Sequence, residues 1–310
     1  MINMTNGVTI AVLTYKRLAY LERALASACR QRGDIREILV IDNAADEELR
    51  FWLKERFPGV RYLAMHYNGG CDGRNLALRA TNAEVVINID DDVELQGTDC
   101  VNRVSEAFAG DPHLACLDFK ILDPEYRIRE RDWCHPRPIA DASRQFETCF
   151  ILEGHSALRR EAALKVGGYS PKFFLYHEGL DLALRLIDDG FRIIYTPEVA
   201  VIHHVAPDAG RAPRFYYCSV RNGIWIAYQY LPFASALADV VEHVAKMTFF
   251  AARAGHLRAH LKGCVDAVRG LSTMERRPLG EEALERLKAI RAERPPLFTR
   301  IHRHLAEQIL

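Results

Sequence analysis

The first two-thirds of the chain alternate short runs of β-branched and aliphatic residues with segments of helical periodicity. The apolar runs, at residues 8–13, 38–41, 60–63 and 85–89, predict buried strands. Helical patterns follow at 19–29, 47–57, 73–80 and 99–109. Such alternation predicts βαβ units, because parallel strands need a crossover that is usually a helix. We therefore expect an α/β fold with a mostly parallel central sheet flanked by helices.

Beyond residue 126 the sequence predicts a different organisation. Residues 127–146 are polar, contain proline and lack periodicity, which is typical of a long functional loop. Ordered patterns then return as helices at 160–166 and 180–189 and as strands at 191–195 and 199–202. After Pro213 only helices are expected. We predict one domain over residues 1–230 and a helical C-terminal extension over 231–310.

The charge of the chain is balanced overall but uneven along its length. The formal net charge is zero, yet from Lys246 onward thirteen Lys and Arg residues stand against seven Asp and Glu residues. This basic part either binds anionic lipid or another polyanion, or forms solvated helix faces. The most apolar segment, 231–252, is interrupted by four polar residues, Asp239, Glu242, His243 and Lys246. It predicts an amphipathic helix rather than a membrane span, so we expect a soluble or at most peripheral protein.

Cysteine spacing and the N-terminus indicate the compartment. The eight cysteines are scattered, with no Cys-x-x-Cys pair, which disfavours a structural zinc site or a disulfide framework. The N-terminus lacks a basic and then apolar signal segment, since residues 8–13 are too short for one. We expect a cytoplasmic protein.

Three consecutive carboxylates, Asp90, Asp91 and Asp92, directly follow the fourth predicted strand. In open α/β sheets ligands bind beyond the carboxyl ends of the strands. Adjacent carboxylates repel one another unless a cation neutralises them, and oxygen ligands favour Mg²⁺, Mn²⁺ or Ca²⁺. The triplet thus predicts a metal site, with a solvated acidic turn as the alternative.

Other polar groups follow neighbouring predicted strands and are expected on the same edge. Residues 14–17 (Thr-Tyr-Lys-Arg) follow the first strand and residues 42–43 (Asp-Asn) the second. Asp42 could accept hydrogen bonds from a nucleobase or a ribose hydroxyl, and either pair could instead cap a helix. The glycine-containing segment 68–75 follows the third strand, and Arg74 adds a fixed cationic fork. That combination predicts a phosphate site.

Two further groups are candidates for chemistry. Glu178 and Asp181 lie at a helix start, where a carboxylate either complements the helix dipole or acts as a general base in a partly apolar pocket. His203 and His204 follow an apolar run, where an imidazole either completes the metal shell begun by Asp92 or is structural.

Taken in order along the chain, these motifs resemble glycosyltransferase family 2, and most closely its rhamnosyltransferase-like branch. The resemblance rests on Thr14-Tyr15-Lys16-Arg17, Asp42-Asn43, Gly70-x-x-Gly73-Arg74-Asn75, Asp90-Asp91-Asp92 and Glu178-x-x-Asp181-Leu182-x-x-Arg185, and it extends from about Val8 to Tyr230. The triplet alone is weakly specific, whereas the five segments in this order are highly specific. The resemblance implies a GT-A fold and a hexosyl- or deoxyhexosyltransferase that uses a nucleoside-diphosphate sugar.

The resemblance also implies roles for individual residues. The donor would contact Thr14, Tyr15, Arg17, Asp42, Asn43, Gly70, Arg74, Asn75, Asp90 and Asp91. A divalent cation, Mg²⁺ or Mn²⁺, would be held by Asp92, Asp90, His204 and His203. The implied mechanism is a single inverting displacement in which a base deprotonates the acceptor hydroxyl and the metal stabilises the departing nucleoside diphosphate.

One position departs from the family pattern. Gly179 stands where the family usually has an aspartate that serves as the base, and glycine cannot take a proton. We therefore expect Glu178 to be the base, with Asp181 second. Two alternatives remain: a catalytically silent sugar-nucleotide-binding protein, and a nucleotidyltransferase, for which the basic glycine loop near the N-terminus is missing.

The acceptor is expected beside the long loop, where Trp133 could stack on a sugar and Glu153, Gly154 and His155 lie close by in sequence. A glycan, a lipid-linked glycan or a small molecule would fit, and no nucleic acid partner is expected. A lipid-linked acceptor would suit peripheral contact of the C-terminal helices with the inner face of the membrane.

Overall fold

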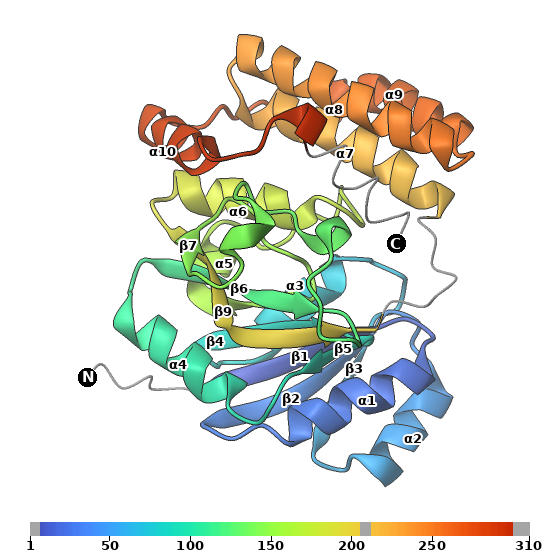
Figure 1. Cartoon of the computed structure of the whole chain (residues 1–310). Coiled ribbons are helices and arrows are strands. Elements are labelled where there is room, and N and C mark those ends of the chain that lie inside the picture. The colour runs from blue at the N-terminus through green and yellow to red at the C-terminus, as the bar shows by residue number, and fades with distance from the viewer. Residues whose placement is uncertain (1–6, 205–211, 300–310) are drawn as a thin grey trace.

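The computed structural model describes residues 7–204 and 212–299, in which a single mixed sheet forms the centre of the protein (Figure 1). Its strands are β1 (Val8–Thr14), β2 (Ile35–Asp42), β3 (Val60–Ala64), β4 (Val85–Asp90), β5 (Val93–Leu95), β6 (Leu114–Leu122), β7 (Phe146–Glu147), β8 (His155–Arg159) and β9 (Arg192–His203). The strand order is β3-β2-β1-β4-β8-β6-β9-β5, with β7 paired to β9. The four strands predicted first, β1 to β4, form the parallel half, and the expected α/β class is confirmed.

The other half of the sheet is not uniformly parallel. Strand β8 pairs antiparallel with both β4 and β6, and β5 and β7 pair antiparallel with β9, whereas β6 and β9 are parallel. The two apolar runs predicted at 191–195 and 199–202 form one long strand, β9.

The ends of the parallel strands are aligned in a way that positions the polar motifs. Thr14 of β1 lies opposite Asp42 of β2, and Leu13 lies opposite Asp90 of β4. Three of the segments singled out in the sequence therefore begin at one edge of the sheet, as their positions after successive strands predicted.

Helices cover both faces of the sheet (Figure 1). They are α1 (Leu18–Cys29), α2 (Glu47–Arg56), α3 (Asp72–Ala80), α4 (Cys100–Gly110), α5 (Arg160–Lys165), α6 (Glu178–Asp188), α7 (Pro213–Tyr230), α8 (Phe233–Arg253), α9 (Leu257–Gly270) and α10 (Glu281–Arg291). Alternate residues of β1 point to opposite faces. Val8, Ile10 and Val12 pack with α1, α2 and α4, whereas Ala11 packs with α3, α5 and α6.

The C-terminal helices stack over α6 on the side away from α1 and α2 (Figure 1). Helix α7 joins this layer to the rest. Asn222 donates its amide hydrogens to the carbonyls of Phe173, Leu175 and Tyr176, and Trp225 donates to the carbonyl of Ala267 at 2.9 Å. Helix α7 ends at Tyr230, and the division into a domain over residues 1–230 and a helical extension over 231–310 stays a prediction. Across 7–204 and 212–299, no helix combines the length and the apolar character that crossing a bilayer requires.

Candidate functional site

Asp91 is the structural anchor of the acidic triplet. It is fully buried and accepts a hydrogen bond from the Thr14 hydroxyl at 2.7 Å and one from the Tyr15 backbone N–H at 3.4 Å. Arg17 bridges two members of the triplet, at 2.5 Å from Asp91 and 2.6 Å from Asp92. Burial raises the pKa of Asp91 to about 7, against the opposing effect of Arg17. The segment 14–17, Asp91 and Asp92 thus form one unit, on which the Tyr15 ring remains exposed.

Asp90 forms a second, separate unit with Arg74. The Nη2 atom of Arg74 lies 2.6 Å from Asp90 Oδ1, and Arg74 is only 4% exposed. Burial alone would raise the pKa of Asp90, but the guanidinium outweighs it and holds that pKa below its ordinary value. The Nε and Nη1 atoms of Arg74 are buried and have no hydrogen-bond partner within the protein. Buried donors without partners are costly, so this fork is suited to an anionic ligand.

Gly154 lies directly against the Asp90 carboxylate. A Cβ built on Gly154 would be 2.5 Å from Asp90 Cγ, and its φ of +81° favours glycine. The Gly154 carbonyl also accepts the Asp90 N–H at 3.3 Å. Gly154, predicted to contact the acceptor, therefore touches Asp90, predicted to contact the sugar-nucleotide donor.

The atoms that could hold a divalent cation gather around Asp92. Its Oδ1 atom is buried without a hydrogen-bond partner and lies 3.8 Å from Nε2 of His203. The His155 ring lies 4.9 Å from the His203 ring, and its Nε2 atom is also buried without a partner. His204 turns away, with Nε2 2.8 Å from Glu94, although its backbone N–H donates to the Asp92 carbonyl. In the described part of the chain, no three carboxylate, imidazole or thiol groups converge as a metal cluster. An Asp and a His fit a cation whose remaining ligands are phosphate oxygens and water.

Asp42 and Asn43 are engaged in local structure. Asp42 is fully buried and accepts hydrogen bonds from the backbone N–H groups of Ala44 and Asp46, each at 2.7 Å, and from the Tyr62 hydroxyl at 2.8 Å. Asn43 donates to the Gly70 carbonyl at 3.1 Å. These bonds shape the turn after β2. Direct contact of either side chain with a sugar-nucleotide donor stays a prediction.

The glycine-containing segment 68–75 is held in place by contacts with Phe174 and Tyr169. Gly70 has a φ of +56°, and a Cβ there would be 2.2 Å from the Phe174 carbonyl oxygen. The Cys71 N–H donates to that carbonyl at 2.9 Å. Asn75 donates to the Tyr169 carbonyl and accepts from its N–H, both at 2.7 Å. The segment thus positions α3, and Arg74 is its group best placed for phosphate.

Two carboxylates meet beneath the cavity described below. Glu153 accepts the Gly179 N–H at 2.7 Å, and Glu178 is the residue directly before Gly179 at the start of α6. Burial, followed by the charge of Glu153, raises the pKa of Glu178 well above its ordinary range. Its Oε2 atom is buried with no hydrogen-bond partner, as suits a protonated carboxyl. Burial also raises the pKa of Glu153. Unlike Glu178, this residue is partly exposed and lines the cavity.

Asp181 is held by two strong contacts in the protein interior. It is 1% exposed, is ion-paired with Arg185 and accepts a hydrogen bond from the Tyr230 hydroxyl at 2.6 Å. Arg185 also donates to the Val166 and Gly168 carbonyls. Both Asp181 oxygens are therefore engaged in joining α6 to α7 and to the turn before Tyr169.

Replacing Tyr230 by phenylalanine is expected to lower the free energy of unfolding by about 1.5–3 kcal/mol, because a hydrogen bond to a buried charged group is lost. Urea denaturation measures the change. We expect turnover of the folded variant to stay near that of the wild type. Unchanged stability together with lost turnover would assign the Asp181–Tyr230 pair to chemistry instead.

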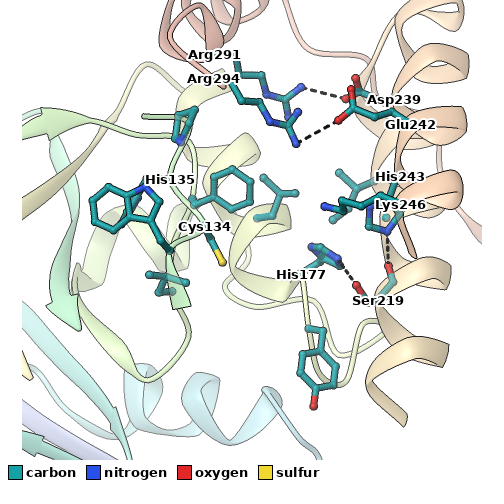
Figure 2. A pocket seen from close by; sticks show the side chains of 18 of the residues that line it. Cys134, His135, His177, Ser219, Asp239, Glu242, His243, Lys246, Arg291 and Arg294 are labelled. Carbon is teal, nitrogen blue, oxygen red and sulfur yellow. Dashed lines mark hydrogen bonds and ion pairs between the residues drawn. The ribbon is translucent and has the colours of Figure 1, made fainter. Parts of the chain in front are cut away.

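A cavity of about 390 Å³ opens beside Glu153 (Figure 2). Its walls come from the long loop 130–139, from residues 150–153, from the start of α6, and from α7, α8 and the end of α10. Trp133, predicted to stack on a sugar, is part of the wall. Its indole N–H donates to the Arg137 carbonyl at 2.6 Å, and its ring packs edge-on to His135 and Tyr195. The long loop is thereby ordered by an aromatic cluster.

The polar side of the cavity is formed mainly by charged and imidazole groups of α8 (Figure 2). Asp239 is paired with Arg291 at 3.1 Å and Glu242 with Arg294 at 3.8 Å. His243 Nε2 lies 3.0 Å from the carbonyl oxygen of Ser219, and burial lowers the pKa of His243 to about 3.

Opposite α8, His177 Nε2 lies 3.0 Å from the Ser219 hydroxyl. Burial lowers the pKa of His177 to about 4. Both imidazoles are therefore neutral at pH 7. None of these residues belonged to a site predicted from the sequence. For those of α8, the only sequence signal was a cluster of polar residues that interrupts an apolar helical segment.

Comparisons with known proteins identify the family and the fold. The family model described as Glycosyl transferase family 2 matches residues 9–168. The N-acetylglucosaminyl-diphospho-decaprenol L-rhamnosyltransferase of Mycobacterium tuberculosis is 26% identical, over 72% of this chain and 84% of that protein. The predicted resemblance to the rhamnosyltransferase-like branch is confirmed.

Two solved structures share the fold. GalNAc-T7 with UDP, GalNAc and Mn²⁺ aligns with a TM-score of 0.62 at 12% identity, over 87% of this chain and 58% of that one. Mannosyltransferase PcManGT from Pyrobaculum calidifontis, in complex with GDP-Man and Mn²⁺, aligns with a TM-score of 0.55 at 18% identity, over 98% and 89% of the two chains. The chain thus spans little more than half the length of GalNAc-T7. The expected GT-A type of architecture is confirmed.

Proposed function

This chain belongs to glycosyltransferase family 2, and from that premise we propose that it transfers a hexosyl or deoxyhexosyl group from a nucleoside-diphosphate sugar to an acceptor hydroxyl, with inversion. One observation carries the proposal. The donor-side group Asp90–Arg74 and the acceptor-side cavity meet at Glu153 and Gly154.

The donor would lie along the edge of the sheet between the two units of the triplet. Arg74 would receive the diphosphate, since two of its buried donor atoms lack partners. The exposed Tyr15 ring would lie against the nucleobase, beside Thr14 and Arg17. Arg17 neutralises Asp91 and Asp92 when no cation is bound.

A divalent cation, Mg²⁺ or Mn²⁺, would be held by Asp92 and His203, two of the four ligands that the sequence predicted together with Asp90 and His204. It would stabilise negative charge on the departing diphosphate. The buried, unpartnered Oδ1 atom of Asp92 supports this assignment.

Glu153 would act as the general base. It takes the proton of the acceptor hydroxyl, the freed oxygen attacks the anomeric carbon, and the bond to the diphosphate oxygen breaks with its electron pair leaving on the nucleoside diphosphate. Unlike Glu178, Glu153 lines the cavity. Base and leaving group then lie on opposite sides of the sugar, as a single inverting displacement requires.

The acceptor would occupy the cavity, with Trp133, Glu153 and His155 near its reacting end. We propose that the acceptor is a lipid-linked glycan, by analogy with the N-acetylglucosaminyl-diphospho-decaprenol L-rhamnosyltransferase of Mycobacterium tuberculosis. The setting would be the cytoplasm, at the inner face of the membrane. The free state of the eight cysteines supports a reducing compartment.

The test combines binding and turnover. Calorimetric titration with a panel of nucleoside diphosphates in Mg²⁺ or Mn²⁺, followed by transfer assays with the matching sugar nucleotides, should show metal-dependent binding and product. Binding without transfer to any acceptor would indicate the catalytically silent protein. Absence of binding across the panel would contradict the proposal.

Replacing Arg74 by lysine is expected to raise the dissociation constant of the nucleoside diphosphate about tenfold, because an ammonium cannot reproduce two fixed guanidinium donors. Calorimetry measures the change. Arg79→Lys on the same helix is the matched control, since Arg79 is exposed. Equal affinities of both variants would remove Arg74 from the diphosphate site.

A further inference from the structure

Helix α8 turns polar side chains toward the protein interior and apolar side chains toward solvent. Its polar side chains Asp239, Glu242, His243 and Lys246 point into the cavity (Figure 2). The exposed residues of this helix are Phe233, Ala234, Ser235, Leu237, Ala238, Val241, Ala245, Phe249, Ala252 and Arg253. Surface helices of globular proteins ordinarily show the reverse arrangement. Apart from Ser235 and Arg253 near its two ends, the outer face of α8 therefore lacks the polar groups that normally keep a helix face in water.

Helix α9 continues this apolar surface. Leu257, Leu261, Val265 and Val268 recur at helical spacing and are exposed, with Leu261 at 53% and Val268 at 64%. Large apolar side chains exposed side by side mark an interaction surface more often than isolated ones do.

The two helices lie beside each other and against α7. A Cβ on Gly263 of α9 would lie 2.5 Å from the Tyr217 carbonyl oxygen of α7, and a Cβ on Gly223 of α7 would lie 2.6 Å from His243 Nε2 of α8. Ala236 and Met247 of α8 are buried. Figure 1 shows α8 and α9 as the outermost layer, farthest from the sheet.

The exposed charged residues of α8 and α9 are cationic. They are Arg253, Arg258, Lys262 and Arg269. The carboxylates of these two helices, Asp239, Glu242 and Asp266, are partly buried and ion-paired with Arg291, Arg294 and Arg269. On α9 the three cations follow the apolar row along one side. An apolar stripe flanked by cations is the pattern of helices that lie in a membrane interface.

We propose that the outer faces of α8 and α9 dock the protein on an anionic lipid surface, with the apolar rows entering the acyl boundary and the four cations meeting phosphate head groups. A second copy of the chain fits this surface less well, because a symmetric contact would bring the same cations together. Membrane docking itself does not depend on the proposed function. Only its consequence for a membrane-anchored acceptor, described next, rests on that function.

Docking would bring the cavity to the lipid. Helix α8 separates the two, and a helix is only about 10 Å across. The same helix would then contact lipid with one face and the acceptor with the other. An acceptor anchored in the membrane would reach Glu153 without leaving the interface.

The test is co-sedimentation of the full chain with vesicles of phosphatidylcholine alone or mixed with phosphatidylglycerol, without donor or acceptor. The wild type should bind the anionic vesicles and release at high salt. Val241→Glu combined with Leu261→Glu should weaken binding at least about tenfold, because charged groups replace apolar ones at the acyl boundary. Phe51→Glu, at a 67% exposed position of α2, is the matched control and should bind as the wild type does.

Two outcomes would overturn the proposal. One is a wild type that binds neither kind of vesicle. The other is a wild-type dimer in sedimentation equilibrium that Val241→Glu splits, since a second copy would then cover the face. Circular dichroism checks that the variants fold, and turnover on a water-soluble acceptor should be unchanged. Because vesicle binding is measured without substrates, its failure leaves the proposed transferase activity standing, and the reverse also holds.

Discussion

Replacing Glu153 by glutamine is expected to lower kcat by about 10²–10⁴-fold, the range that a positioned general base contributes. Glutamine keeps the shape of the side chain and can still accept the Gly179 N–H, but it cannot take a proton. Affinity for the nucleoside diphosphate should stay at the wild-type value, because the donor contacts through Arg74 are untouched. Single-turnover kinetics and calorimetry measure the two quantities separately.

The pH profile provides a second readout of the same variant. Burial raises the pKa of Glu153 above its ordinary value of 4.5. A base works only when ionised, so kcat/KM should rise as the pH rises through that elevated pKa, and the acid limb should lie above pH 4.5. Glu153→Gln should lose this limb.

Glu178→Gln is the matched control. The pKa of Glu178 lies well above its ordinary range because the group is buried and faces Glu153. A protonated carboxyl and an amide are similar in shape and charge, so this variant should keep most of its turnover. If instead Glu178→Gln abolishes turnover and Glu153→Gln does not, the base is Glu178, as the sequence predicted.

The parallel half of the sheet was predictable because its signals are local. Continuous apolar runs separated by helical periodicity define β1 to β4, and a polar residue directly after each run must emerge at one edge. This reasoning correctly placed Thr14, Asp42 and Asp90 together.

The antiparallel half was not predictable in the same way. Strand β8 is only five residues long, and β6 contains Asp118 and Lys120 within its sequence. Their pairing depends on partners distant in sequence, so local propensity decides little.

The sequence also did not show which polar residues are structural and which line the cavity. Asp42, Asn75 and Asp181 have the residue types of ligand-binding groups, but their hydrogen-bonding atoms are occupied by backbone and side-chain partners. The cavity is formed by segments from residue 130 to residue 295. A helical period shows that the polar residues of α8 share a face, but it does not show whether that face meets water or the interior.

Gly179 shows how the structure accommodates the missing aspartate. Gly179→Ala is expected to lower the free energy of unfolding by about 3 kcal/mol, at the upper end of the usual cost of overpacking. A Cβ there would lie 2.0 Å from the Ile151 carbonyl oxygen, so backbone would have to move. Alanine would otherwise favour the helix by about 1 kcal/mol, which is too little to reverse the sign. Urea denaturation measures the change, and Gly110→Ala on α4, where a Cβ meets open space, is the control expected to be neutral or stabilising.

The Gly179→Asp variant distinguishes a site that has lost an aspartate base at position 179 from a site whose base is Glu153. If glycine marks a lost base, aspartate should raise turnover. We expect the opposite, because the new side chain would meet the Ile151 carbonyl oxygen and stand beside Glu153 and Glu178, and an unpaired carboxylate in that interior is costly. The variant should therefore be less stable than Gly179→Ala, with lower turnover. A stable and faster Gly179→Asp enzyme would return the base to position 179 and leave Glu153 as an acceptor contact. A destabilised one would mean that the space an aspartate side chain needs is already taken by the Ile151 carbonyl and the Glu153 carboxylate.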